Sequence, residues 1–186
     1  MPYKNMIISS KSQSQKALFI RKIVSNYKYW LAGFFTEEIR ENGARIGFAV
    51  QPIGGEKTLF ASKKIISKES FNKYGVNLEA FENTAVNALR EGLALNKILV
   101  IDEIGAMTLA SGVFMNSVTE SLLSESPVLV TMRPGTKVFC GTFSRMEGTK
   151  MIELSEKNRL KIEKEVEEWL ESWIKRIRKP RQGEND

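Results

Sequence analysis

Hydrophobic and polar residues follow two periods along this chain, and the two periods predict strands and helices in turn. Short apolar runs bounded by polar or turn-forming residues predict strands at Asn5–Ser9, Leu31–Arg40, Arg45–Pro52, Lys57–Ala61, Ile98–Asp102, Val128–Met132 and Lys150–Leu154. Apolar residues spaced by three and four predict helices at Ser14–Tyr27, Leu78–Leu95, Ser111–Leu123 and from Ser155 onward. Strands and helices alternate except for a strand-rich insert after the first helix, and this order predicts a three-layer α/β fold.

The insert and the last helix add detail to this pattern. Asn42-Gly43 lies between two strands of the insert, and this pair is a strong signal for a β-hairpin turn. The last helix carries one apolar stripe, formed by Ile162, Val166, Trp169, Leu170, Trp173, Ile174 and Ile177. Its first part is expected to pack on the sheet, whereas Trp173 and Ile177 either extend the core or bind a partner helix or a membrane surface. Residues 1–178 are predicted to form one domain, and the polar tail from Lys179 to be disordered.

The segment Ile98–Gly105, which reads ILVIDEIG, is the most informative one for chemistry. An apolar run that ends in two acids is typical of a buried parallel strand that delivers carboxylates to the edge of a sheet. In P-loop nucleotide hydrolases an aspartate in this place holds Mg²⁺, and a neighbouring group orients the attacking water. Ligands of such sheets bind at the carboxyl ends of the strands. We therefore expect Lys16, which follows the first strand, to lie at the same edge as Asp102.

The segment that should form the phosphate loop keeps only part of the required chemistry. In the pattern GxxxxGK[ST], Ser10 and Gln15 take the places of the two glycines, and Ala17 takes the place of the serine or threonine. Glycine lets the backbone turn tightly and bring its N–H groups against phosphate oxygens, and the hydroxyl binds Mg²⁺. Only the lysine, Lys16, remains.

Five further segments occur in the order in which one family has them. Gly33–Arg40 reads GFFTEEIR, Arg45–Phe48 reads RIGF, Tyr74–Asn77 reads YGVN and precedes Phe81-Glu82, Asp102–Met107 reads DEIGAM, and Asn158-Arg159 opens the last helix. From Asn5 to about Leu170 the chain resembles the cancer-related nucleoside-triphosphatases, a family also known from thermophiles. The resemblance implies a P-loop fold, hydrolysis of a nucleoside triphosphate to the diphosphate and phosphate, and ATP or GTP with Mg²⁺ as ligands.

The resemblance also implies roles for particular residues. The candidates are Glu103, Glu37 and Glu38 for catalysis, Asp102 for Mg²⁺, Lys16, Ser10, Ser12 and Ser14 for phosphate, and Arg40, Arg133 and Arg159 as additional groups. Neighbours on a strand point to opposite faces, so at most one of Glu37 and Glu38 is expected to face the nucleotide. The arginines have structural alternatives, because Arg40, like Arg45, flanks the hairpin turn and Arg159 can brace the last helix.

The departures from the family pattern leave more than one function open. The family's loop reads roughly GxPGxGKTT, and here its three glycines and first threonine are replaced; Thr108 also stands where the family usually has glutamate. We expect a family member with weak or lost hydrolysis and a nucleotide-binding or regulatory role. The alternative is an active Mg²⁺-dependent enzyme with an unusual serine-rich loop. A second alternative is a nucleic-acid-binding protein that uses its basic N-terminus and tail, although the chain has no recognisable nucleic-acid motif.

Composition removes other classes of protein. The 186 residues include no histidine and one cysteine, Cys140, which excludes Ser-His-Asp triads and intrachain disulfides and leaves Cys140 as an incidental thiol. The net charge of +6 gathers at the ends: residues 1–30 carry six basic and no acidic side chains, and residues 175–186 carry five basic and two acidic ones. Such clusters bind polyphosphates, RNA or acidic partners, or are simply solvated. No apolar run is long enough to span a membrane and no signal-peptide pattern is present, so a cytoplasmic location is expected.

Overall fold

The computed structural model describes residues 3–133, 141, 143 and 145–178, and every element below belongs to these residues. The strands are β1 (Asn5–Ser9), β2 (Leu31–Glu41), β3 (Ala44–Pro52), β4 (Thr58–Ser62), β5 (Ser70–Phe71), β6 (Tyr74–Val76), β7 (Ile98–Ile104), β8 (Val128–Met132) and β9 (Thr149–Glu153). The helices are α1 (Gln13–Tyr27), α2 (Leu78–Ala94), α3 (Gly112–Leu123) and α5 (Arg159–Ile177), with a 3₁₀ turn at Glu156–Asn158. Cys140 and the tail from Lys179 lie outside the described residues.

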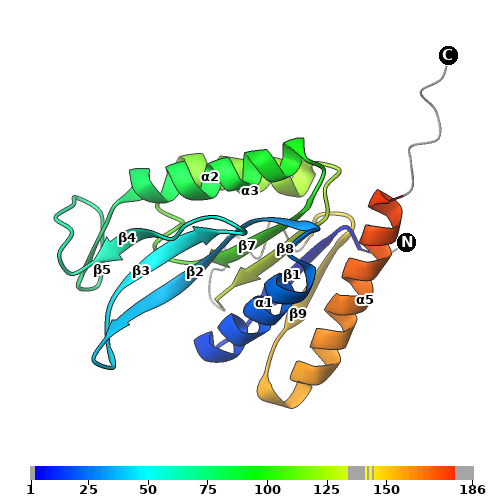
Figure 1. The fold of residues 1–186 in the computed structure, drawn as a ribbon, viewed down its shortest axis with the longest axis horizontal. Helices are drawn as coiled ribbons and strands as arrows, with labels where there is room; N and C mark the ends of the chain where they lie inside the picture. Colours follow the sequence, from blue (N-terminus) through cyan, green and yellow to red (C-terminus); the bar gives the residue numbers. More distant parts are fainter. Residues whose placement is uncertain (1–2, 134–140, 142, 144, 179–186) are drawn as a thin grey trace.

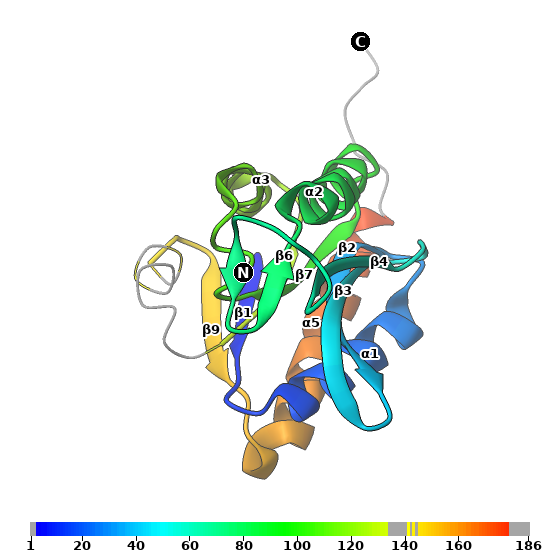
Figure 2. The ribbon, with the colours of Figure 1, turned by 90° about the vertical axis from the view of Figure 1, so that its left-hand side faces the viewer.

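The described strands form one mixed sheet in the order β5-β6-β4-β3-β2-β7-β8-β1-β9. The part from β2 through β7, β8 and β1 to β9 is parallel, and the insert from β2 to β6 is antiparallel. In Figures 1 and 2, α2 and α3 cover one face of the sheet and α1 and α5 cover the other. The predicted three-layer α/β fold, with a hairpin insert after the first helix and a long C-terminal helix, is confirmed.

The predicted elements differ from the observed ones mainly where local signals are short. The strands β5 and β6 have two and three residues, too few to show a period, and they were not predicted. The first helix begins at Gln13 rather than Ser14. The last helix begins at Arg159, because Ser155 is followed by the 3₁₀ turn, in which the Ser155 N–H donates to Asn158 Oδ1 at 2.8 Å.

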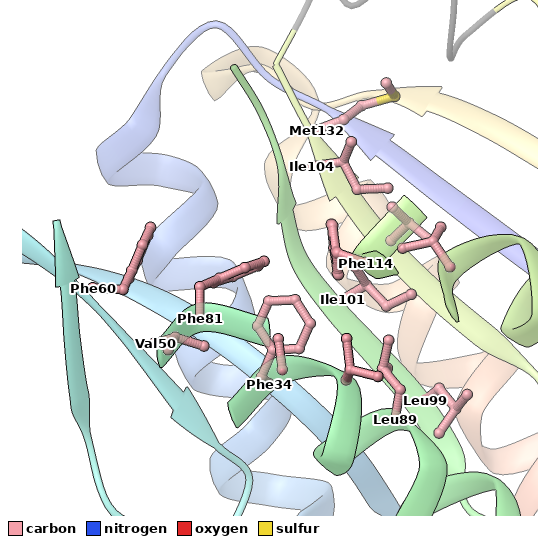
Figure 3. Packing of buried hydrophobic residues seen from close by; sticks show 14 of the residues in the cluster. Phe34, Val50, Phe60, Phe81, Leu89, Leu99, Ile101, Ile104, Phe114 and Met132 are labelled. Carbon is pink, nitrogen blue, oxygen red and sulfur yellow. The ribbon is translucent and has the colours of Figure 1, made fainter. Parts of the chain in front are cut away.

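The face under α2 and α3 is held by a cluster of aromatic rings around Phe81. The Phe81 ring centroid lies 5.8 Å from that of Phe34, 5.1 Å from that of Phe60 and 5.0 Å from that of Phe114. All four side chains are buried, and Figure 3 shows them converging from two helices and two strands. This cluster joins the antiparallel insert to the parallel half of the sheet.

Gly33 sets the close contact between β2 and β7. Its φ is +98°, and a Cβ added to it would lie 2.2 Å from the carbonyl oxygen of Val100. Any side chain here would push the two strands apart, so the glycine that opens the GFFTEEIR segment has a structural reason. The tight pairing carries Glu37 and Glu38, farther along β2, to the same region as Asp102, since Phe35 is the register partner of Asp102.

The other face carries the apolar stripe of α5. Ile162, Val166, Trp169, Leu170 and Ile174 are buried against α1 and the parallel strands, and Trp173 and Ile177 pack against the same core while partly exposed. Among the described residues, no helix combines the length and the apolar character that crossing a bilayer requires.

Candidate functional site

The candidate site lies at the carboxyl edge of the parallel strands, where β1, β7 and β8 end side by side. The strand β1 leads through Ser10–Ser12 into α1 and Lys16, β7 carries Asp102 and Glu103, and β8 is followed by Arg133. The strands β7 and β8 are register partners at Asp102 and Thr131, and their pairing shifts by one residue between Asp102 and Ile104. Glu103 lies within this irregularity, and the expected meeting of Lys16 with the acidic strand end is observed.

The segment aligned with the phosphate loop is largely helical. The helix α1 begins at Gln13, three residues before Lys16, and the Ser12 hydroxyl caps it by accepting the Gln15 N–H at 3.4 Å. The Ser10 hydroxyl accepts the Ser12 N–H at 3.2 Å, and the hydroxyls of Ser12 and Ser14 lie 3.2 Å apart. The three serine hydroxyls therefore bond within the segment, and two of the backbone N–H groups that could meet a phosphate already have acceptors.

Lys16 is fully buried and forms an ion pair with Glu103. Glu103 also pairs with Arg133, whose Nε lies 3.1 Å from Glu103 Oε1, and Arg133 donates to the Gln13 side chain at 3.4 Å. Burial lowers the pKa of Lys16 to about 8, the nearby Asp102 opposes this change, and Arg133 adds to it. The Glu103 carboxylate thus lies between two cations, one buried and one half-exposed.

The pKa of Lys16 predicts a pH dependence of stability. The pKa of this lysine is about 8 in the folded protein and 10.5 in the unfolded chain. Between these two pH values the unfolded chain holds more protons than the folded protein, so the free energy of unfolding rises with pH. The cost of burying the ammonium is fully present below pH 8. Urea unfolding at pH 7 and pH 9.5 should show the wild type gaining stability relative to Lys16→Met, which cannot titrate. A difference that stays constant or shrinks would contradict the assignment.

Asp102 is buried beneath this pair. The Thr131 hydroxyl donates to Asp102 Oδ1, and a backbone hydrogen bond comes from Thr36. Burial raises the pKa of Asp102, while Lys16 and these two hydrogen bonds act in the opposite direction. The carboxylate is therefore engaged by protein groups and is disfavoured as an anion.

Glu37 and Glu38 form ion pairs with different partners. Glu37 pairs with Arg21 of α1 at 2.7 Å and with Lys57. Glu38 pairs with Arg40 and Arg45, both at 2.7 Å, and the arginine hydrogen bonds and charges lower the pKa of Glu38 against the effect of burial. Both residues line the same pocket beside Glu103, so neither is singled out as the one that faces the site.

The remaining arginine candidates are placed differently. Arg40 and Arg45 both bind Glu38 close to the hairpin turn, and Arg45 also donates to the Tyr74 hydroxyl at 3.2 Å. Arg159 begins α5 and lies 3.6 Å from Glu163, four residues along the same helix. Of the three arginine candidates, the structure therefore brings Arg133 into contact with the acidic strand end.

Two hollows border this region. A pocket of about 40 Å³ beside Glu103 is lined by Gln13, Thr36, Glu37, Glu38, Phe48, Phe60, Phe71, Glu103, Gly105, Ala106, Met107, Thr108 and Arg133. A wider groove of about 540 Å³ runs between α1 and β2 and shares Gln13, Thr36, Glu37 and Glu38 with it. Neither Lys16 nor Asp102 lines these two hollows, whereas Glu103 and Arg133 line the smaller one.

The donors at Asp102 do not fit Mg²⁺ as they stand. Among the described residues no group of three or more acidic, histidine or cysteine side chains could hold a metal ion. Mg²⁺ needs near-octahedral oxygen ligands and keeps several waters, whereas Asp102 is buried with Thr131, and Lys16 and Arg133 already neutralise Glu103. Ala17 supplies no hydroxyl.

Sequence reasoning missed Thr131 and the structural role of Thr108. The contact of Thr131 with Asp102 depends on the pairing of β7 with β8. The apolar run around Thr131 gives no signal for this contact. The Thr108 hydroxyl accepts the Gly105 N–H at 3.0 Å and lies 3.2 Å from the Glu103 carbonyl oxygen. Thr108 therefore closes the turn after β7. The sequence showed only that this threonine departs from the family pattern, not that it has this structural role.

Comparison with known proteins supplies the family. A family model described as NTPase matches residues 5–167. The nucleoside-triphosphatase THEP1 of Thermotoga petrophila is 36% identical over 134 residues, which cover 72% of this chain and 75% of that protein. The protein of the same name from Thermotoga sp. (strain RQ2) is 32% identical over 161 residues, covering 87% of this chain and 92% of that protein.

Solved structures match over nearly the whole chain. The crystal structure of THEP1 from the hyperthermophile Aquifex aeolicus matches with a TM-score of 0.79 at 32% identity, covering 90% of this chain and 99% of that one. The solution structure of a human cancer-related nucleoside triphosphatase matches in fold, with a TM-score of 0.72 at 23% identity and coverage of 92% and 98%. From the family model, the relatives and the shared fold together, the chain belongs to the family of THEP1-type nucleoside-triphosphatases.

Proposed function

We propose that this family member hydrolyses nucleoside triphosphates weakly or not at all, and that it acts as a nucleotide-binding or regulatory module. The observation that carries the proposal is the early start of α1 at Gln13. A phosphate loop works because consecutive backbone N–H groups converge on the phosphates. Here α1 begins early, and its first N–H groups already have acceptors: the Gln15 N–H donates to the Ser12 hydroxyl at 3.4 Å and the Lys16 N–H to the Ser12 carbonyl at 3.2 Å.

The charges at the strand end support the same proposal. A lysine that binds the β- and γ-phosphates must reach them, but Lys16 is buried against Glu103. An acid that orients water must be free to accept its proton, but Glu103 is paired with both Lys16 and Arg133. Binding a triphosphate in the usual way would require both ion pairs to open.

The expected loss of activity is large. Removing one preorganised donor from a site that stabilises developing negative charge costs about 10²–10³ in rate. Here three glycines that shape the loop are replaced and the threonine hydroxyl is lost, so several donors are expected to be misplaced or missing together. Side chains of the serine-rich segment can still bind a nucleotide weakly. We expect its hydrolysis to be slow.

The test is isothermal titration with ATP and GTP, each with and without Mg²⁺, beside a phosphate-release assay. The proposal predicts little or no phosphate release above the background of the Asp102→Asn variant, whether or not a nucleotide binds. Mg²⁺-dependent micromolar binding, with release that disappears in Asp102→Asn, would contradict it. That outcome would establish the alternative, an active enzyme whose serine-rich segment rearranges around phosphate.

A further inference from the structure

The edge of the sheet opposite the candidate site gathers the ends of three helices. The strands β2 and β7 begin there as register partners, Leu31 beside Ile98, and the Ile98 N–H donates to the Trp30 carbonyl at 3.0 Å. This pairing brings the turn after α1 next to the turn after α2. The end of α5 joins them, because the Arg178 guanidinium lies 4.6 Å from the Trp30 ring centroid.

Two adjacent aromatic rings lie between two cations across these three turns. The Lys97 ammonium lies 4.5 Å from the Tyr29 ring centroid, the Tyr29 and Trp30 centroids are 5.0 Å apart at 79°, and Arg178 covers Trp30. Lys28 precedes Tyr29 and is exposed. We call Lys28, Tyr29, Trp30, Lys97 and Arg178 the basic-aromatic strip. Its members come from residues 28–30, 97 and 178, so only the folded chain assembles it.

Helix dipoles explain part of this arrangement but not all of it. A cation at the end of each helix offsets the negative end of the dipole, and Lys28, Lys97 and Arg178 follow α1, α2 and α5. This effect needs no aromatic ring. Yet Tyr29 is 72% exposed, while Trp30 beside it packs partly against the core and is held in place. Tyr29 is thus a large exposed ring that is supported by the fixed Trp30 and flanked by cations. Such a ring fits a ligand with flat rings and negative charge.

We propose that the basic-aromatic strip binds single-stranded nucleic acid without sequence preference. Such binding combines cations that follow the phosphates with an aromatic ring on which a base stacks. Lys28, Lys97 and Arg178 supply three charges for the backbone, and Tyr29 supplies the stacking face. An anionic membrane fits less well, because the cations lie over the rings and Trp30 is held against the core. The strip lies at the opposite edge from Glu103, so this proposal does not depend on the fate of hydrolysis.

The test is fluorescence anisotropy with a labelled twelve-nucleotide poly-uridine RNA at 50 to 200 mM KCl. With three phosphates neutralised, the logarithm of the affinity should fall against the logarithm of salt concentration with a slope of about −2. Tyr29→Ala, which removes a mostly exposed ring, should weaken binding about tenfold. Lys28→Gln/Arg178→Gln should make the slope about 1.4 less steep, because each lost phosphate contact removes about 0.7.

The matched control is Lys63→Gln/Lys64→Gln, which removes the same charge from two exposed lysines in the turn after β4. This control should change affinity less than twofold. Equal losses in the two double variants, or no effect of Tyr29→Ala, would overturn the proposal in favour of general attraction by net charge. Absence of RNA binding at 50 mM KCl would also overturn it, as would binding to vesicles containing phosphatidylserine when RNA is not bound.

Discussion

Restoring the loop by Ser10→Gly, Gln13→Gly, Gln15→Gly and Ala17→Thr should raise the affinity for Mg²⁺–ATP by about a hundredfold, the effect of two recovered hydrogen bonds to the charged phosphates. Glycine costs about 1 kcal/mol per residue in a helix relative to alanine, so two glycines in the first turn of α1 should move its start toward Lys16. The N–H groups of the segment are then free to converge on phosphate. The threonine returns a hydroxyl that can bind Mg²⁺.

The affinity is measured by isothermal titration on the restored variant and the wild type in parallel, with phosphate release as a second readout. The control adds Lys16→Ala to the restored loop and should remove most of the gain, because the ammonium then no longer reaches the phosphates. Thermal unfolding without nucleotide shows whether the fold tolerates the glycines. A well-folded restored variant that binds no better than the wild type would mean that the substituted loop is not what limits binding.

Phe81→Ala should lower the free energy of unfolding by about 4 kcal/mol. The ring is fully buried, and its centroid lies within 5.8 Å of the centroids of Phe34, Phe60 and Phe114. Truncation removes the buried apolar area of the ring. It leaves a cavity between α2 and the strands from both halves of the sheet. Because those rings come from β2, β4 and α3, none of them can fill the space without moving its own element.

Urea unfolding followed by circular dichroism measures this loss. The control is Leu95→Ala just after α2, where the side chain is 66% exposed and the expected change is within about 0.5 kcal/mol. Similar losses in both variants would contradict the idea that the aromatic cluster joins the insert to the parallel half. A change in the denaturant slope of Phe81→Ala would indicate that the insert unfolds separately.

The sequence predicted the elements whose signals are local. The strand from Ile98, the turn at Asn42-Gly43 and the stripe of the last helix each depend on residues within one segment, and each is found. The strands β5 and β6 were missed because they are stabilised by pairing with β4 and with each other rather than by their own pattern.

The candidate site was predictable in its parts but not in its contacts. The order of strands and helices brought Lys16 and Asp102 to one edge. That Lys16 pairs with Glu103, and that Thr131 binds Asp102, depends on the register of β7 against β8 and on where α1 begins. A serine-rich segment is compatible with either a loop or a capped helix. In the structure Ser12 is the N-cap of the helix that begins at Gln13.

The place of β1 in the sheet has a consequence for synthesis on the ribosome. Asn5–Ser9 is made before every other described strand, yet its two neighbours are Val128–Met132 and Thr149–Glu153. At a translation rate of about 5–20 residues per second, the apolar residues Met6, Ile7 and Ile8 wait roughly six seconds or longer for their first partner. During that interval an unpaired apolar strand is available to chaperones or to a strand of another nascent chain. The emerging chain is therefore most prone to aggregate before its C-terminal third has been released.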